Sequence, residues 1–296
     1  MDNVKSENSI GYWLDAVQDE FSKNAPELLN LFIIYAEEAR FGRAYIDSDL
    51  IALSQPKNIL EVGAGSLLLS CQLIREGFHV TSLEPIGNGF SHFDRMREIV
   101  LKVAIEQNIE TEILDIHAET LTINDYFDYA FSINVMEHVD DVEQVLKAVG
   151  NSLCGHAVYR FTCPNYLFPY EPHFNIPTLF SKQLTENIFY KKIFLHSMDD
   201  PKGTWESLNW ITAPLVKKIV KSSSYLSLRF NKSMLTHIFT RVVEDKALAD
   251  RRSPFVMRVI RTIVFFRLHL LFLVIPVSCQ PAMDCVITKC KPLEAV

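Results

Sequence analysis

The chain has 296 residues, of which 48% are hydrophobic and 22% are charged, as is typical of a globular protein with one large domain and a cap or with two small domains. Its formal net charge of −7 argues against a dedicated nucleic-acid-binding protein, so we expect no nucleic-acid partner. The six cysteines include no C-x-x-C pair, which favours thiols in a reducing compartment over a zinc site.

The first part of the chain, from residue 10 to residue 51, has a helical pattern. The apolar residues Trp13, Val17 and Phe21 recur at helical spacing, and Pro26 is expected to open a second helix from Leu28 to Glu38.

The pattern of residues 58–78 predicts a strand, a glycine turn and a helix. Ile59 and Val62 belong to a short apolar run that suits a strand buried on both faces of a parallel sheet. Gly63 and Gly65 allow a tight turn and the close approach of a ligand to the backbone. This strand–turn–helix unit is the half-site on which α/β folds hold nucleotides.

Two carboxylates indicate which nucleotide this half-site holds. Glu61 stands at the end of the first strand, where it suits an ammonium group or an ordered water better than a phosphate. Glu84 ends a second strand, from His79 to Leu83, where a carboxylate can accept both hydroxyls of a ribose. A hydride-transfer fingerprint would have a third glycine at the position of Leu68, and its absence disfavours a nicotinamide cofactor.

The alternation of helices and strands continues as far as Pro164. We expect helices from Phe90 to Asn108 and from Val142 to Leu153, and strands from Ile113 to Ile116, from Phe127 to Ile133 and from Ala157 to Thr162. Asp140 and Asp141 are well placed to cap the helix that begins at Val142.

The pattern changes over residues 164–210, which are rich in aromatic residues, proline and histidine. This segment is too long for a simple connection, and it leaves the edge of the sheet where ligands bind, so we interpret it as a substrate lid. Thr212 is expected to cap a following helix, and residues 225–230 and 283–288 to form the last two strands.

Residues 251–277 are predicted to form an apolar, basic helix. We favour a core helix packed on the sheet, and the alternative is a helix that lies on a membrane surface. The apolar run from Leu268 to Val277 spans about 15 Å of helix, too little to cross a hydrocarbon core of about 30 Å. The polar N-terminus shows no signal-peptide pattern, so we expect a cytoplasmic protein, peripheral to the inner face of the membrane if this helix is exposed.

Several of these segments together resemble class I S-adenosylmethionine-dependent methyltransferases. The sequence EVGAG at 61–65 with Glu84 resembles motif I and the ribose-binding acid, and HAETL at 117–121 resembles the segment along the adenine. FDYAFSINVMEHV at 127–139 resembles the fourth strand and the turn after it. The match covers residues 59–165 and implies S-adenosyl-L-methionine as the cofactor.

The resemblance also implies the fold and the domain organisation. The fold class is α/β, with a Rossmann-like, doubly wound, mostly parallel seven-stranded sheet and helices on both faces. The divisions are an N-terminal helical flap (1–55), the cofactor-binding core (56–165), the substrate-lid insertion (166–210) and the C-terminal part of the core with the apolar basic helix (211–296).

The cofactor-binding residues that the resemblance implies are Glu61, Gly63, Ala64, Gly65, Glu84, Pro85, Ala118, Glu119 and Asn134. Many relatives have aspartate at the position of His117, so the adenine contact is expected to pass to the Ala118 backbone and to Glu119. In some relatives an arginine before the first strand reaches the cofactor carboxylate, and Arg43 is either that arginine or part of a solvated helix face.

A hydroxyl acceptor needs a base, and histidine is suited to this role at neutral pH. His138 follows the fourth strand and His173 lies in the expected lid, where Glu171 is placed to orient it; either histidine can instead be structural. No convincing carboxylate set surrounds Glu137, so we expect no metal. The aromatic lid suggests a small-molecule or lipid- or glycan-linked acceptor.

Two other functions stay open on the residues alone. One is a nicotinamide-dependent oxidoreductase, which the missing third glycine and the segment at Ala118 and Glu119 oppose. The other is a methyltransferase-like binding protein without catalytic activity, which no sequence feature excludes.

Overall fold

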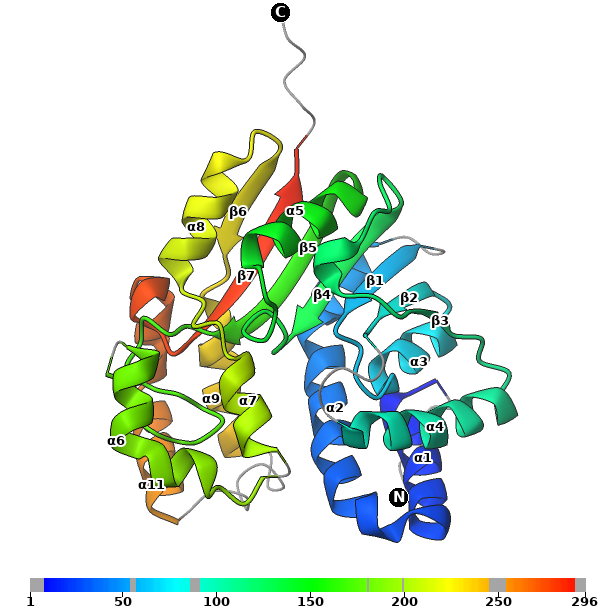
Figure 1. The fold of residues 1–296 in the computed structure, drawn as a ribbon, viewed down its shortest axis with the longest axis horizontal. Coiled ribbons are helices and arrows are strands. Elements are labelled where there is room, and N and C mark those ends of the chain that lie inside the picture. Colours follow the sequence, from blue (N-terminus) through cyan, green and yellow to red (C-terminus); the bar gives the residue numbers. More distant parts are fainter. Residues whose placement is uncertain are drawn as a thin grey trace, which may run out of the picture. The chain divides into compact units, whose positions relative to one another are not determined.

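The computed structural model describes residues 8–53, 57–85, 91–179, 181–198, 200–244 and 254–290. These residues form a seven-stranded sheet with the strand order β3-β2-β1-β4-β5-β7-β6 (Figure 1). The strands are β1 (Asn58–Val62), β2 (His79–Leu83), β3 (Glu112–Leu114), β4 (Phe127–Ile133), β5 (Leu153–Pro164), β6 (Leu226–Phe230) and β7 (Ala282–Lys289). The predicted seven-stranded, Rossmann-like sheet is confirmed, and β1 pairs in parallel with both β2 and β4.

Helices lie on both faces of this sheet, as predicted (Figure 1). They are α1 (Ile10–Asn24), α2 (Leu29–Ala52), α3 (Leu68–Arg75), α4 (Ser91–Glu106), α5 (Val142–Ser152), α6 (Lys182–Phe194), α7 (Pro201–Ser207), α8 (Ala213–Ser222), α9 (Ser233–Glu244) and α11 (Pro254–Phe265). Short 3₁₀ segments are η1 (Pro26–Leu28), η2 (Ala118–Thr120), η3 (Leu268–Leu273) and η4 (Val277–Cys279). The predicted caps at Asp141 and Thr212 are present, since each side chain accepts a hydrogen bond from a backbone N–H of the helix it precedes.

The strand order reverses beside β1. The chain runs from β1 outward through β2 to β3 and then returns to the other side of β1 as β4. Ligands of open α/β sheets bind at the carboxyl ends of the strands at such a reversal. Glu61 lies opposite Phe131 in the β1–β4 pair, so the glycine turn after β1 follows directly at this place.

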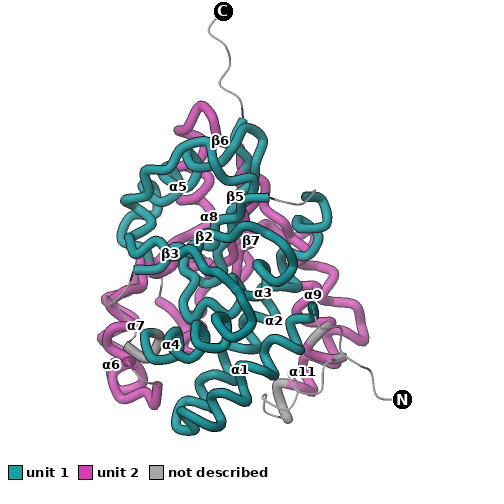
Figure 2. The backbone as a smooth tube through the Cα atoms, turned by 90° about the vertical axis from the view of Figure 1, so that its right-hand side faces the viewer, with its two compact units in different colours: residues 1–135, 139–159, 288–296 teal, residues 136–138, 160–287 magenta. Residues whose placement is uncertain are grey.

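The chain divides into two compact units, shown in teal and magenta in Figure 2. The first unit comprises residues 1–135, 139–159 and 288–296, and the second comprises residues 136–138 and 160–287. Residues 136–138, which follow β4, therefore belong to the second unit, although the chain on either side of them belongs to the first.

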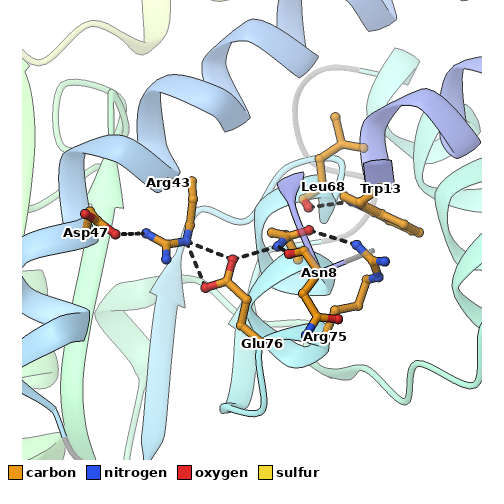
Figure 3. Close-up of polar contacts among 8 residues, drawn as sticks. Asn8, Trp13, Arg43, Asp47, Leu68, Arg75 and Glu76 are labelled. Atoms are coloured by element: carbon orange, nitrogen blue, oxygen red, sulfur yellow. Dashed lines mark hydrogen bonds and ion pairs between the residues drawn. The ribbon is translucent and has the colours of Figure 1, made fainter. Parts of the chain in front are cut away.

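The N-terminal helices of the first unit are attached to α3, the helix that follows the glycine turn (Figure 3). The indole Nε1 of Trp13 donates to the carbonyl of Leu68 at 2.9 Å. Arg43 on α2 donates from Nε to both carboxylate oxygens of Glu76, at 2.8 and 2.9 Å, and from Nη1 to Asp47 at 2.8 Å. These contacts hold the start and the end of α3, and with them the turn that precedes it.

Helix α2 runs to Ala52, well beyond the predicted end at Glu38. The helix tolerates Gly42 in its interior because this glycine lets the backbone approach its neighbours. A Cβ at Gly42 would lie 2.5 Å from the Ile133 side chain and 2.8 Å from that of Leu69. Long-range packing therefore accompanies the continuation of the helix past Glu38, where local helix propensity did not predict it.

A buried polar network organises the second unit. Arg160 and Asp284 form a two-point ion pair at 3.1 and 2.8 Å, with the Asn231 amide donating to the same carboxylate at 2.8 Å. The side-chain amide of Asn165 donates to the carbonyls of Val277 and Gln280, at 3.0 and 2.9 Å. Because each charged or polar group is matched, the network can be buried without an unpaired charge.

The predicted single helix over residues 251–277 is wrong for the residues that the structure describes. Helix α11 ends at Phe265, and Arg267 adopts a left-handed conformation with φ of 57°, after which the chain continues as η3. The favoured role as a core helix packed on the sheet is also wrong for its last turn and for η3. Most apolar side chains from Phe265 to Val274 are exposed. No helix in the described ranges is long and apolar enough to cross a membrane.

Candidate active site

The glycine turn after β1 has the left-handed backbone geometry that favours glycine. Gly63 and Gly65 have φ of 74° and 50°. A Cβ at Gly63 would lie 2.3 Å from a methyl group of Val135, at the end of β4. The Gly63 N–H donates to the carbonyl of Leu83 at 2.8 Å, which fixes the turn against β2. The turn is therefore a tight backbone cradle at the strand reversal.

Glu61 lies buried beside this turn and faces a short chain of hydroxyl groups. Ser70 donates to its carboxylate, and Ser82 donates to the Ser70 hydroxyl at 2.7 Å. Burial raises the pKa of Glu61 to about 8, with the nearby Glu84 charge adding to the rise and the Ser70 hydrogen bond opposing it. Glu61 therefore carries a proton at neutral pH in the ligand-free protein.

Glu84 is held against the turn itself. Its Oε2 accepts a hydrogen bond from the Gly65 N–H at 3.0 Å. Burial raises the pKa of Glu84, and the Gly65 hydrogen bond and the positive charge of Arg97 partly oppose this rise. Arg97 also donates from Nε to the Gly65 carbonyl at 3.3 Å. The structure thus brings together the two predicted residues Gly65 and Glu84, and Pro85 follows half-buried.

The remaining predicted cofactor residues lie in the same unit. Asn134 follows β4 with a left-handed φ of 54°, and Ala64 and Ala118 are buried. Glu119 Oε1 accepts from the N–H groups of Asp140 and Asp141, at 2.9 and 3.2 Å. One oxygen of the Glu119 carboxylate therefore holds the turn before α5, a structural role that the sequence did not indicate.

In some relatives an arginine before the first strand reaches the cofactor carboxylate, whereas the guanidinium of Arg43 contacts two acidic side chains of this protein. Its Nε and Nη1 donate to Glu76 and Asp47, as described above, and no hydrogen bond to a predicted cofactor residue is among those the described residues show. The contacts favour a structural role for Arg43. Arg40 lies near Glu37 and Asp15, at 3.4 and 3.9 Å, as a solvated helix face predicts.

The two predicted histidines meet in the second unit. The ring centroids of His138 and His173 lie 5.2 Å apart in an edge-to-face arrangement. His173 Nδ1 lies 2.6 Å from Oε1 of Glu171, whose side chain is fully buried. The carboxylate of Glu171 also accepts from the N–H groups of His173 and Phe174, at 3.1 and 2.7 Å. Glu171 thus orients His173, as predicted for this pair.

Hydrogen bonds fix which nitrogen of each ring carries a proton. Ser207 donates its hydroxyl to the Thr204 carbonyl at 2.9 Å, so it accepts from His138 Nδ1, which lies 2.8 Å away. His173 Nδ1 likewise donates to Glu171. In the neutral form, both rings therefore carry their lone pair on Nε2.

The electrostatics of the two histidines differ. Burial, together with repulsion from a protonated His173, lowers the pKa of His138 to about 4, while Glu171 opposes the shift. Burial raises the pKa of Glu171, but the hydrogen bond and charge of His173 and two backbone N–H groups outweigh it, so the net shift is downward. His138 is therefore neutral at physiological pH, whereas Glu171 is an ionised partner for His173.

Glu137 completes this cluster with a fully buried side chain. Its backbone carbonyl accepts from the Asn209 N–H at 2.8 Å, and the Asn209 side chain donates to the Met136 carbonyl at the same distance. Ligand atoms of Glu137, His138 and His173 lie within 4.8 Å of one another, so their donor types and spacing also suit a metal ion. The expectation of no metal stays a prediction.

Sequence reasoning missed Ser70, Ser82 and Ser207. Ser70 and Ser82 were detectable in principle, because each is a polar residue in a segment that the structure buries. Ser207 had no such signal, since its partner His138 is 69 residues away in the chain.

Comparison with known proteins agrees with this geometry. A family model described as "Methyltransferase domain" matches residues 60–154. The chain is 44% identical over 278 residues to "Uncharacterized protein Rv1509" of Mycobacterium tuberculosis, covering 94% of each chain. It is 33% identical over 122 residues to a ubiquinone biosynthesis O-methyltransferase of Paramagnetospirillum magneticum, covering 41% of this chain and 42% of that one.

A solved structure has the same fold. It is a phosphoethanolamine N-methyltransferase 2 of Haemonchus contortus in complex with phosphomonomethylethanolamine and S-adenosylhomocysteine. The TM-score is 0.50 at 13% identity, and the match covers 93% of this chain and 60% of that one. The chain belongs to the class I S-adenosylmethionine-dependent methyltransferase family, and S-adenosylmethionine is its cofactor.

Proposed function

We propose that this protein transfers the methyl group of S-adenosylmethionine to a small-molecule or lipid- or glycan-linked acceptor, with His173 as the general base. The observation that carries the acceptor chemistry is the buried Glu171 carboxylate behind His173, at 2.6 Å from Nδ1. A base oriented in this way is of use when the acceptor is a hydroxyl group that must lose a proton.

The residues of the first unit fit the cofactor. The cradle at Gly63 excludes any side chain, Glu61 is buried beside it, and Glu84 accepts a hydrogen bond from the Gly65 N–H. We assign the cofactor ammonium to Glu61 and the ribose hydroxyls to Glu84, with Ala64, Gly65 and the neighbouring backbone lining the cradle. A bound cation would restore the ionised form of Glu61, since an adjacent positive charge lowers the pKa of a carboxyl.

We assign the adenine to the segment of Ala118 and Glu119 and to the end of β4 at Asn134, with Pro85 beside the ribose. The second oxygen of Glu119 is the group that would serve the adenine, since its Oε1 holds the turn before α5. S-adenosylmethionine supplies a methyl group already activated on a sulfonium, so the protein has chiefly to align the acceptor and exclude water.

In the second unit, His173 accepts the acceptor proton at Nε2 while Glu171 stabilises the imidazolium that forms. In other carboxylate–histidine pairs, too, the histidine is the base and the carboxylate stabilises its protonated form. His138 stays neutral because of its low pKa and positions the acceptor through Nε2. We assign residues 166–210, which carry Glu171 and His173, to the cover over the acceptor.

An oxygen acceptor is favoured by one relative as well. The protein of Paramagnetospirillum magneticum that matches 41% of this chain is a ubiquinone biosynthesis O-methyltransferase. The likeness supports an oxygen atom on a small or lipid-linked acceptor. No described contact favours a nicotinamide cofactor, and calorimetry with S-adenosylmethionine and with NAD separates the two functions.

The test of the proposed base is His173→Ala. Loss of a general base reduces turnover by roughly 10²–10⁴, while the affinity for S-adenosylhomocysteine and the melting temperature should stay close to those of the parent protein. The matched control is His79→Ala, an exposed histidine at the start of β2, which should change none of the three. A fall in melting temperature with unchanged turnover per folded molecule would show that His173 is structural.

A chelator separates the base from a metal ligand. If His138 and His173 act as base and positioning residue, treatment with a chelator leaves turnover unchanged. If Glu137 and the histidines hold a divalent cation, turnover falls and is restored by adding the metal. Absence of methyl transfer to every acceptor tested, with cofactor binding intact, would instead support the binding-protein alternative.

A further inference from the structure

The second unit exposes a dense apolar segment at the end of α11 and along η3. Three side chains are largely in solvent: Phe265 at 80%, Phe266 at 64% and Val274 at 72%. Four leucines between them are also exposed, namely Leu268, Leu270, Leu271 and Leu273. Single exposed apolar residues are common, but a contiguous group of this kind marks a surface that contacts something apolar.

The segment is held in place, so its exposure is not that of a frayed end. His269 is buried and its carbonyl accepts from the Thr236 hydroxyl at 3.2 Å. The side-chain amide of Gln280 donates to the carbonyls of Phe272 and Ile275, at 2.8 and 3.0 Å. These contacts thus anchor the backbone to α9 and to the residue that follows η4, and the outward residues are presented to solvent.

The charge of this region is opposite to that of the whole protein. Residues 254–279 contain three arginines and no acidic residue or lysine, whereas the whole chain has a net charge of −7. Arg258, Arg261 and Arg267 are all exposed, on α11 and at its junction with η3. Exposed aromatic and leucine side chains next to arginines are the combination that binds the interface of an anionic bilayer.

A second copy of the chain fits this exposed surface less well than an anionic membrane does. In a two-fold contact each copy presents the same patch, so the three arginines of one copy would face those of the other. The segment has no carboxylate with which to compensate them. A membrane with anionic headgroups supplies that compensation, and no described helix is long and apolar enough to span it.

We propose that residues 258–274 dock this protein on the surface of an anionic phospholipid bilayer. Phe265, Phe266 and the leucines of η3 enter the boundary between headgroups and acyl chains, and the three arginines bind the headgroups. This segment is shorter than the range 251–277 that the sequence pattern indicated. Its binding to a membrane does not depend on the proposed methyl transfer.

The test is flotation of the full chain with vesicles of phosphatidylcholine containing 30% phosphatidylglycerol, and with vesicles of phosphatidylcholine alone. We expect the protein to float with the anionic vesicles and to be released by high salt, since salt screens the arginine contacts. Replacing Phe265 and Phe266 by serine should reduce the bound fraction at least tenfold. Arg258→Gln with Arg261→Gln should reduce it on anionic vesicles in particular.

The matched control replaces Ile51 and Ile105 by serine. These residues are 77% and 73% exposed, comparable to the phenylalanines, but they lie in the first unit and outside the segment 258–274. This variant should bind vesicles as the parent protein does. Equal binding of all variants, or no binding of the parent protein, would overturn the proposal. So would a dimer in sedimentation that the Phe265 and Phe266 variant dissociates, together with no vesicle binding.

Discussion

We predict that Glu61, in its proposed role as the partner of the cofactor ammonium, couples cofactor binding to pH. Its buried carboxyl has a pKa of about 8 in the ligand-free protein, so about 90% of the molecules carry this proton at pH 7. Binding of the cofactor ammonium requires the carboxylate. The apparent dissociation constant therefore exceeds the intrinsic one by a factor of about 11 at pH 7 and about 2 at pH 8, because only the ionised fraction is competent.

The measurement is calorimetric titration with S-adenosylhomocysteine between pH 6.5 and 8.5. We expect the affinity to rise roughly 25-fold over this range, as the pKa of Glu61 predicts. At pH 7 about 0.9 proton should be released on binding, measured from the difference between two buffers of unequal ionisation enthalpy. Glu61→Gln keeps the shape of the side chain and the Ser70 contact but has no proton to lose, so it should bind weakly and without this pH dependence.

A second consequence of the same group concerns stability. The folded pKa of Glu61 lies above the ordinary value of 4.5, so the folded state keeps a proton that the unfolded state loses. The free energy of unfolding contributed by this group is fully present below about pH 4.5 and is lost as pH rises to about 8. Denaturant unfolding of the ligand-free protein should show this slope, and Glu61→Gln should reduce it. If the affinity of the parent protein for S-adenosylhomocysteine does not change with pH and no proton is released on binding, the conclusion that Glu61 is neutral in the ligand-free protein is refuted.

Two further substitutions test the cradle. Glu84→Ala should weaken cofactor affinity by one to two orders of magnitude, the loss of one or two charge-assisted hydrogen bonds, and unchanged affinity in a folded variant would remove Glu84 from the site. Gly63→Ala should lower both the melting temperature and the cofactor affinity, because φ is 74° and the new Cβ would lie 2.3 Å from Val135. A Gly63→Ala protein as stable as the parent would mean that the turn can open.

The local elements could be predicted from the sequence because their causes are local. The apolar run before Gly63 and the two glycines specify a strand and a tight turn through backbone sterics alone. The helix caps at Asp141 and Thr212 follow from side chains that reach N–H groups only three residues ahead. The order of strands and helices, and through it the Rossmann-like sheet, follows from this series of local signals.

The partners of the buried polar groups could not be predicted in this way. Ser70 and Ser82 surround Glu61 only because α3 packs beside β1 and β2. Arg43 binds Glu76, 33 residues away, and this contact favours a structural role for Arg43. Such pairs depend on which helices and strands pack together. They have no characteristic spacing in the sequence from which they could be predicted.

What the sequence by itself determined is the cofactor half of this protein, because a strand, a glycine turn and two strand-end carboxylates lie within 27 residues of chain, 58–84. Only the tertiary structure decided the rest. It ended the predicted helix of residues 251–277 at Phe265, where a left-handed Arg267 redirects the chain and turns apolar side chains outward. It also brought His138 to His173 across 35 residues, since long-range packing, and not local periodicity, sets such contacts.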